Sequence, residues 1–169
     1  KCVEVLPCVE DFEDGSADGW FADDDSDPSG DKVGDWSVVA DGDNQVYAQA
    51  TEYSDDSWAV GGNVSWTDQR IEVKARFTAI SDDSAQLYVA ARFRDEDNYY
   101  FMYLRAHGSA RVRKRFEGST TDLVATVRLP IVPAAGTWYT IVLEARGTTI
   151  SASVNGTMVG SATDASIAN

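Results

Sequence analysis

The sequence has few cysteines, one histidine and no long apolar run. Nowhere do about 18 apolar residues follow one another, so no membrane-spanning helix is expected. Cys2 and Cys8 lack the C-x-x-C spacing of a redox or metal pair, and no second cysteine pair lies nearby. We therefore expect a local disulfide, which favours an extracellular setting. The start at Lys1, without Met or an apolar leader, is expected of a mature fragment or an excised module.

Basic residues are scarce overall but concentrated in the middle of the chain. There are 28 Asp and Glu residues against 14 Lys and Arg residues, a net charge of −14, which argues against nucleic acid and anionic membranes as partners. Residues 1–69 hold 18 acids and 2 bases, residues 70–115 hold 6 acids and 10 bases, and residues 116–169 hold 4 acids and 2 bases. A basic middle segment therefore lies within an acidic protein.

Helical periodicity is also missing, whereas alternation with a period of two is common from Asp68 onward. In residues 69–77, Ile71 and Val73 fall on one face and Lys74 on the other, as in a half-buried strand. Asn155-Gly156 predicts a type I′ hairpin. Turn signals every eight to twelve residues predict an all-β protein, a two-sheet antiparallel sandwich.

A resemblance to a known family is carried by an ordered series of segments. They are DFEDGSADGW, WSVVADGDNQVYAQ, NVSWTDQRIEVKARF, VAARFRDEDNYYFMYLR, GTWYTIVLEARGTTISASVNG and SATDASIA. Over residues 11–168 the chain resembles bacterial LamG-like, concanavalin A-like jelly-roll domains. Such domains are commonly appended to secreted polysaccharide lyases and glycoside hydrolases. The resemblance implies a secreted carbohydrate-binding module, as a monomer or as part of a larger enzyme.

The same resemblance predicts the domain boundaries. Residues 1–10 form an N-terminal extension that the family generally lacks, and residues 11–169 form a single domain. Family members continue into a closing C-terminal strand, whereas this sequence ends at Asn169. We therefore expect either that this strand is lacking or that the N-terminal extension takes part of its place.

A structural calcium ion is a further expectation. In many β-sandwich carbohydrate-binding modules a calcium ion bridges the N-terminal segment to the closing strand, which here implies Asp11, Glu13 and Asp14 as ligands. An alternative set has the alternate spacing of a calcium loop, although Pro28 excludes an EF-hand. This alternative set is Asp23, Asp25 and Asp27.

Alternation sends tyrosine and arginine side chains from three consecutive strands to one face. Guanidinium groups bind carboxylates bidentately, and aromatic rings provide flat surfaces for sugars. This face therefore predicts binding of an acidic polysaccharide, such as pectin or alginate. The alternative is an ordinary solvated sheet whose arginines pair with acids across strands. The candidate residues are Tyr88, Arg92, Arg94, Tyr99, Tyr103, Arg105, Arg111, Arg113 and Arg115, with Trp20 as an exposed platform beside the loops.

Two other functions stay open at this stage. A jelly-roll polysaccharide lyase needs a charge neutraliser, a base and an acid, which Tyr103, Arg105 and His107 supply in principle. The signatures of known jelly-roll alginate lyases and glucanases are absent, however. Laminin-G-like sandwiches also bind proteins, so an adhesive domain is the second alternative. A non-catalytic binding module is the favoured interpretation.

Overall fold

The computed structural model describes residues 7–24, 36–50 and 57–167. The chain forms two compact units, residues 1–63 and residues 64–169. The boundary falls inside the range for which the sequence predicts one domain. The described residues form strands and turns, and no helix among them has the length and apolarity that crossing a bilayer requires.

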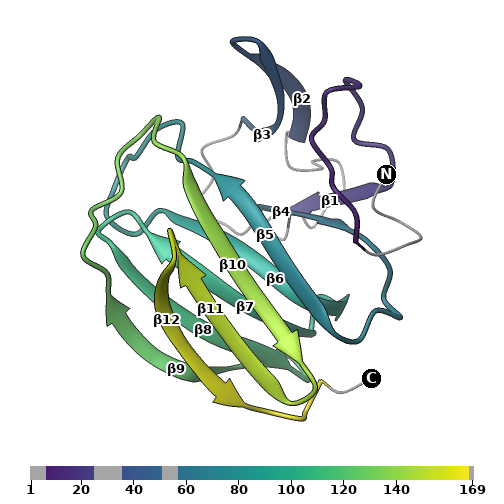
Figure 1. The fold of residues 1–169 in the computed structure, drawn as a ribbon, viewed down its shortest axis with the longest axis vertical. Coiled ribbons are helices and arrows are strands. Elements are labelled where there is room, and N and C mark those ends of the chain that lie inside the picture. The colour runs from purple at the N-terminus through teal and green to yellow at the C-terminus, as the bar shows by residue number, and fades with distance from the viewer. Residues whose placement is uncertain (1–6, 25–35, 51–56, 168–169) are drawn as a thin grey trace. The chain divides into compact units, whose positions relative to one another are not determined.

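The first unit contains two strand pairs and a cluster of aromatic side chains. β1 (Trp20–Asp24) pairs with β4 (Ser57–Gly61), and β2 (Trp36–Asp41) pairs with β3 (Asn44–Gln49) (Figure 1). The ring of Tyr47 lies 5.1 to 5.9 Å from those of Phe12, Trp20 and Trp36. Gly61 lies under the indole of Trp20, where a Cβ atom would come within 2.9 Å of the ring. Close packing of aromatic residues therefore stabilises this unit.

The second unit is a sandwich of two antiparallel four-stranded sheets. One sheet has the order β12-β11-β10-β5 and the other the order β6-β7-β8-β9 (Figure 1). The strands are β5 (Gln69–Ala75), β6 (Gln86–Asp95), β7 (Asn98–Arg105), β8 (Ser109–Phe116), β9 (Ser119–Arg128), β10 (Tyr139–Arg146), β11 (Thr149–Val154) and β12 (Thr157–Thr163). The prediction of an all-β, two-sheet sandwich is confirmed.

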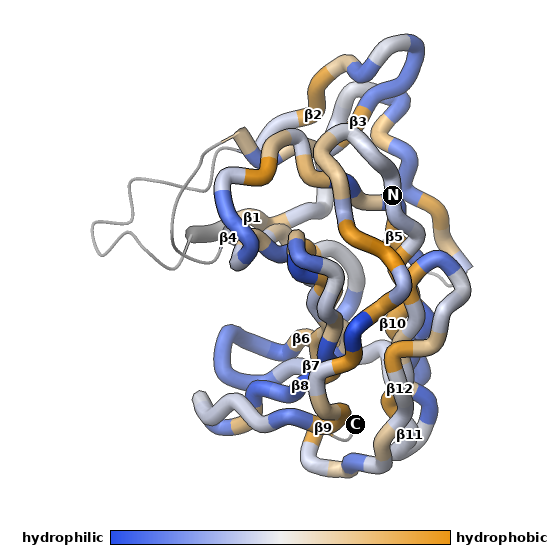
Figure 2. The backbone as a smooth tube through the Cα atoms, turned by 90° about the vertical axis from the view of Figure 1, so that its left-hand side faces the viewer, coloured by the Kyte–Doolittle hydropathy of each residue, from blue (hydrophilic) through white to orange (hydrophobic). Residues whose placement is uncertain are grey.

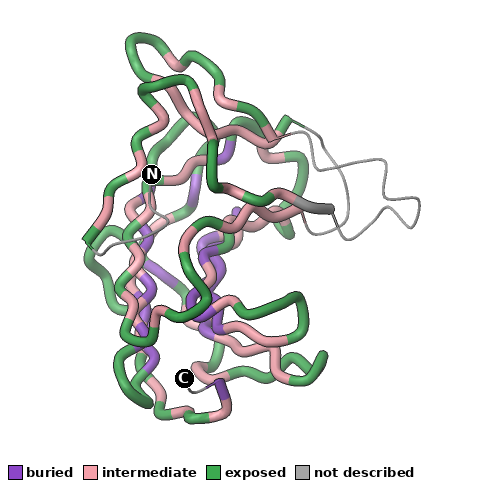
Figure 3. Tube along the Cα trace, turned by 90° about the vertical axis from the view of Figure 1, so that its right-hand side faces the viewer, coloured by how far each residue is buried: buried purple, intermediate pink, exposed green. Residues whose placement is uncertain are grey.

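The core of the second unit is built from alternate residues of both sheets. Tyr100, Met102 and Leu104 of β7 are fully buried, as are Ile141 and Leu143 of β10. Burial alternates along β10, whereas residues 100–104 of β7 are all buried. Apolar stretches of the backbone are orange in Figure 2, and buried positions are purple in Figure 3. Successive side chains of a strand point to opposite faces, so the remaining side chains lie on the face of each sheet that is turned away from the core.

Left-handed residues close the tight hairpins. Asn155 and Gly156, between β11 and β12, have φ angles of 48° and 77°. Both are positive, as a type I′ turn requires, so the predicted hairpin is confirmed. Glu117 and Gly118 repeat this pattern between β8 and β9, with φ angles of 50° and 74°.

Candidate functional site

The register of β6, β7 and β8 brings the predicted tyrosines and arginines together. Tyr88 lies opposite Tyr103, which lies opposite Arg111, and in the next row Phe101 lies opposite Arg113. The neighbouring residues of these strands point into the core, as the alternation predicts. We call the surface turned away from the core the outer face. Its residues are Gln86, Tyr88, Tyr99, Phe101, Tyr103, Arg105, Arg111, Arg113 and Arg115.

A stack of aromatic rings forms the centre of the outer face. The ring centroid of Tyr88 lies 5.8 Å from that of Phe101 and 5.9 Å from that of Tyr103. Tyr88 is 46% exposed, whereas Phe101 and Tyr103 are only 6% and 2% exposed. Tyr99 extends the stack, 5.3 Å from Phe101. The exposed ring of Tyr88 thus packs against two buried rings, and these contacts limit its motion.

Two guanidinium groups flank this stack. The Cζ atom of Arg105 lies 5.2 Å from the ring centroid of Tyr103, and that of Arg113 lies 5.9 Å from the centroid of Phe101. Cation–π attraction favours these positions. The exposed Tyr88 ring therefore has a hydrogen-bond donor group near it on each side.

Aspartates neutralise part of the arginine row. Asp122 of β9 accepts from Arg111 Nη1 at 3.0 Å and from Arg113 Nε at 2.7 Å. Arg115 Nη2 lies 3.2 Å from Asp97 Oδ1. Arg111 and Arg113 thus pair with an acid across strands, as the alternative predicts, and Arg115 pairs with an acid of the turn before β7. The sequence analysis did not identify Asp122, because this residue lies on the next strand, outside the three strands considered.

Arg92 does not belong to the outer face, which corrects the sequence prediction. Ala91 pairs with Tyr100 and Asp95 with Asn98, so residues 92–94 lie opposite Tyr99 alone, in a bulge. Arg92 takes a left-handed conformation there, with a φ of 50°. A bulge changes the direction of side chains locally. Its side chain is therefore buried, with the residue only 5% exposed.

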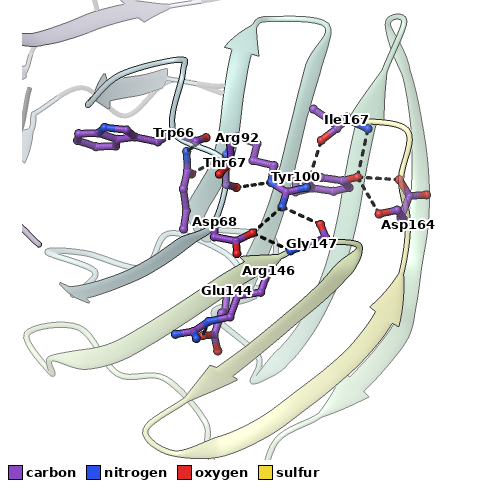
Figure 4. Close-up of polar contacts among 11 residues, drawn as sticks. Trp66, Thr67, Asp68, Arg92, Tyr100, Glu144, Arg146, Gly147, Asp164 and Ile167 are labelled. Carbon is purple, nitrogen blue, oxygen red and sulfur yellow. Dashed lines mark hydrogen bonds and ion pairs between the residues drawn. The ribbon is translucent and has the colours of Figure 1, made fainter. Parts of the chain in front are cut away.

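The buried guanidinium of Arg92 joins three segments of the second unit (Figure 4). It donates to the carbonyl oxygens of Thr67 at 2.7 Å, Gly147 at 2.7 Å and Ile167 at 3.3 Å, and Asp68 lies 3.6 Å away. A buried charge needs such partners. Arg92 is thus a structural residue.

The bulge also moves two neighbours of Arg92. Phe93, which alternation assigns to the core, instead packs against Tyr99 with a centroid distance of 5.3 Å. Arg94 is exposed near the 95–98 turn, at one end of the outer face. The row of aromatic rings is therefore longer than the sequence predicts, and fewer arginines than predicted lie on the outer face.

A second polar cluster lies on the core side of β7 and β8. Lys114 and Tyr100 both donate to Asp164, and Ser166 donates to it through its backbone N–H at 2.9 Å. Burial raises the pKa of Asp164, but the hydrogen bonds from Lys114, Ser166 and Tyr100 outweigh it and hold this pKa well below the ordinary value. Burial, followed by the bond to Asp164, raises the pKa of the Tyr100 phenol. The bond to Asp164 explains why the side chain of Lys114 points toward the core.

Trp20 is not an exposed platform, contrary to the prediction. Its ring is half-buried against Phe12 and Tyr47, with centroid distances of 5.6 and 5.9 Å, and it covers Gly61. The neighbouring Phe21 is the exposed residue, at 63%. Trp20 alternates with Phe21 along β1, so one of the two had to pack inward.

The three residues proposed for a lyase do not form an accessible acid–base set. Tyr103 is buried, and Arg105 lies over its ring. Both ring nitrogens of His107 are engaged: Nδ1 lies 2.8 Å from the carbonyl oxygen of Asp83, and Nε2 lies 2.7 Å from Ser109 Oγ. A carbonyl oxygen can only accept, so Nδ1 carries a proton, and Nε2 is hydrogen-bonded to the hydroxyl. His107 therefore holds a turn together.

The candidate calcium ligands are occupied by local hydrogen bonds. Asp11 Oδ1 accepts from the backbone N–H of Glu13 at 3.2 Å, and Asp14 Oδ1 accepts from that of Ser16 at 2.9 Å. Glu13 Oε1 accepts from the backbone N–H of Gln45 at 3.0 Å. Within the described ranges no three acidic, histidine or cysteine side chains gather into a possible metal site. The structural calcium ion therefore stays a prediction from the family resemblance.

Two other predictions concern residues outside the described ranges. Asp25 and Asp27 of the alternative calcium set lie outside them, and the side chain of Asp23 is likewise not described. Cys8 is disulfide-bonded, while Cys2 lies outside the described residues.

The fold has a known counterpart although the sequence has no clear relative. No protein-family profile matches the chain, and no curated protein matches its sequence. The structure is similar to the carbohydrate-binding module CBM66 from Bacillus subtilis, with a TM-score of 0.62 and 19% sequence identity. The match covers 86% of this chain and 80% of the other. At this identity the likeness establishes the β-sandwich fold, and the resemblance to LamG-like domains stays a prediction.

Proposed function

We propose that this chain is a non-catalytic carbohydrate-binding module that binds an extracellular polysaccharide through the outer face of the β6–β9 sheet. The observation that carries the proposal is the exposed ring of Tyr88, which rests on the buried rings of Phe101 and Tyr103. A fixed aromatic ring with one polar side suits a sugar, whose ring has an apolar face and a polar rim. The fold shared with a carbohydrate-binding module supports the same conclusion.

The polar groups around Tyr88 complement hydroxyl groups. Arg111 and Arg113 share the single carboxylate of Asp122, so donors and acceptors lie side by side. A sugar hydroxyl both donates and accepts, and it can therefore bond to both kinds of group. Arg105 supplies a further donor on the other side of the stack. This composition suits a chain of hydroxyl-rich sugars.

The sequence prediction that the ligand is an acidic polysaccharide is tested separately from sugar binding itself. It depends on guanidinium groups whose charge is not balanced by carboxylates. Asp122 and Asp97 balance much of the charge on β8, and Arg92 is buried. Arg105, together with the two arginines that share one aspartate, still gives this face a positive charge. A polyuronide and a neutral polysaccharide are therefore the two ligands to compare.

The test is binding to a panel of neutral and acidic polysaccharides by affinity electrophoresis, followed by calorimetry on those that bind. Tyr88→Ala should weaken binding about tenfold or more, since a central aromatic anchor contributes upward of 1.4 kcal/mol. Trp138→Ala is the matched control, because Trp138 is 42% exposed and precedes β10 in the other sheet. Equal losses in both variants, or no binding to any polysaccharide, would overturn the proposal.

A further inference from the structure

Two buried polar atoms of the outer face have no hydrogen-bond partner among the described residues. They are Oε1 of Gln86 and Nε of Arg105. The two residues are directly opposite one another on β6 and β7. Opposed residues of antiparallel strands are neighbours on the same face, so the two side chains with an unpaired atom lie beside one another.

Such atoms are rare in folded proteins and have a physical cost. Nearly all buried polar groups are hydrogen-bonded, because a buried group without a partner loses its hydration and gains nothing in return. In the described part of the second unit, the other buried side-chain nitrogen and oxygen atoms follow this rule. Gln69 of β5, for example, accepts from the backbone N–H of Arg92 at 2.8 Å and donates to the carbonyl oxygen of Trp66 at 2.9 Å. The pair on the outer face is therefore an exception that needs an explanation.

The position of the pair connects it with the proposed sugar site. Gln86 is two residues from Tyr88 on β6, and Arg105 lies over the ring of Tyr103, which Tyr88 contacts. The stacking on Tyr103 restricts the plane of the guanidinium group. Gln86 and Arg105 are both partly exposed as residues, so a ligand on this face beside Tyr88 lies next to their side chains.

We infer that Gln86 and Arg105 form the hydroxyl-recognition subsite of the outer face, an inference that rests on the proposed function. One sugar hydroxyl donates its proton to Gln86 Oε1 and accepts the Nε–H of Arg105, which satisfies both atoms at once. A carboxylate has only acceptors, so it satisfies Arg105 and is opposed by the amide oxygen. At this position the subsite therefore favours a hydroxyl over a carboxylate, so a sugar that presents its carboxylate here binds more weakly than its neutral counterpart.

The stability of two glutamine variants separates this role from a structural one. In Gln86→Leu an unpaired acceptor is replaced by an apolar group, so the melting temperature should stay the same or rise. In Gln69→Leu, the matched control, a satisfied amide is removed and the melting temperature should fall. A fall for Gln86→Leu as large as that for Gln69→Leu would show that Gln86 is a structural residue and would overturn the inference.

Affinity is the second readout, measured by calorimetry on the polysaccharide that binds the unaltered chain best. Gln86→Leu should weaken binding about tenfold, because a site built to bond a hydroxyl loses much of its affinity without that bond. Gln69→Leu, assayed well below its melting temperature, should bind normally. If Tyr88→Ala weakens binding and Gln86→Leu does not, the subsite is refuted and the proposed function stands. A chain that binds no polysaccharide would overturn both.

The ligand class is tested by comparing a neutral galactan with polygalacturonate. The inference predicts tighter binding of the galactan, and Gln86→Glu should further disfavour polygalacturonate because a carboxylate then faces the ligand's carboxylates. Tighter binding of polygalacturonate by the unaltered chain would contradict the selectivity assigned to the pair.

Discussion

Arginine occupies two contrasting regions of the β6–β9 sheet. Arg92 is buried, and carbonyl oxygens from three separate segments surround its guanidinium group. Arg113 and Arg105 lie on the outer face, each over an aromatic ring, and Arg113 is paired with an aspartate that remains partly exposed. The same side chain thus fixes the fold in one region and presents donors to solvent in the other.

The difference comes from the backbone and not from the residue type. On regular β7 and β8, alternation decides which face each side chain takes. At Arg92 the bulge and the left-handed φ turn a nominally outward side chain inward. A buried charge then requires a full set of partners, whereas an exposed one does not.

The largest expected effect comes from Arg92→Ala. Removal of the guanidinium leaves the carbonyl oxygens of Thr67 and Gly147 without this donor, so the free energy of unfolding should fall by about 2–4 kcal/mol. Urea denaturation measures this, with Arg113→Ala as the outer-face control, for which a loss of about 0–1 kcal/mol is expected. Equal losses would remove the distinction between the two regions.

The next largest expected effect is a loss of stability at acid pH, caused by protonation of Asp164. Its pKa is lowered in the folded chain, so its stabilising effect is present above the unfolded pKa of about 3.9 and is lost as the pH falls below that value. The melting temperature should therefore begin to fall near pH 5 and should continue to fall well below pH 3. Asp164→Asn should be less stable at pH 7, by about 1.5–3 kcal/mol, and should show a flatter pH dependence. An unchanged pH profile in this variant would argue against the role of Asp164.

A smaller effect is expected from Asp122→Asn on the outer face. The pair is partly exposed, so the free energy of unfolding should change by about 1 kcal/mol or less. Binding should change more than stability, because Arg111 and Arg113 then lack a carboxylate. Affinity for polygalacturonate should rise and become more sensitive to salt, as calorimetry at two ionic strengths would show. Unaltered binding of this polymer would place the ligand away from β8.

The smallest effect is expected from Arg115→Gln. Arg115 lies opposite Tyr99, two rows from Tyr103, and its partner Asp97 is exposed. Both the free energy of unfolding and the binding free energy should change by less than about 0.5 kcal/mol. A larger loss of affinity, measured in the same calorimetric series, would extend the binding surface toward the 95–98 turn.

Regular strands are the part of this structure that the sequence predicts well. Alternation identifies the two faces of β7 and β8, and Asn155-Gly156 identifies its hairpin. The site was harder to predict because its details depend on irregular or distant partners. The bulge at Arg92 has no glycine or proline to mark it, and Asp122 reaches the arginines only through the pairing of β8 with β9. Alternation also places Gln86 on the outer face, but no sequence feature shows that its amide lacks a partner.

The central claim is that sugars bind to the outer face of the β6–β9 sheet. The most direct measurement is the change in backbone amide NMR shifts when an oligosaccharide of the bound polymer is titrated into the protein. The account predicts the largest changes at Tyr88, Arg105 and Arg113 and small changes along β10 and β11. Changes centred on β10, β11 and β12, or on the first unit alone, would contradict it.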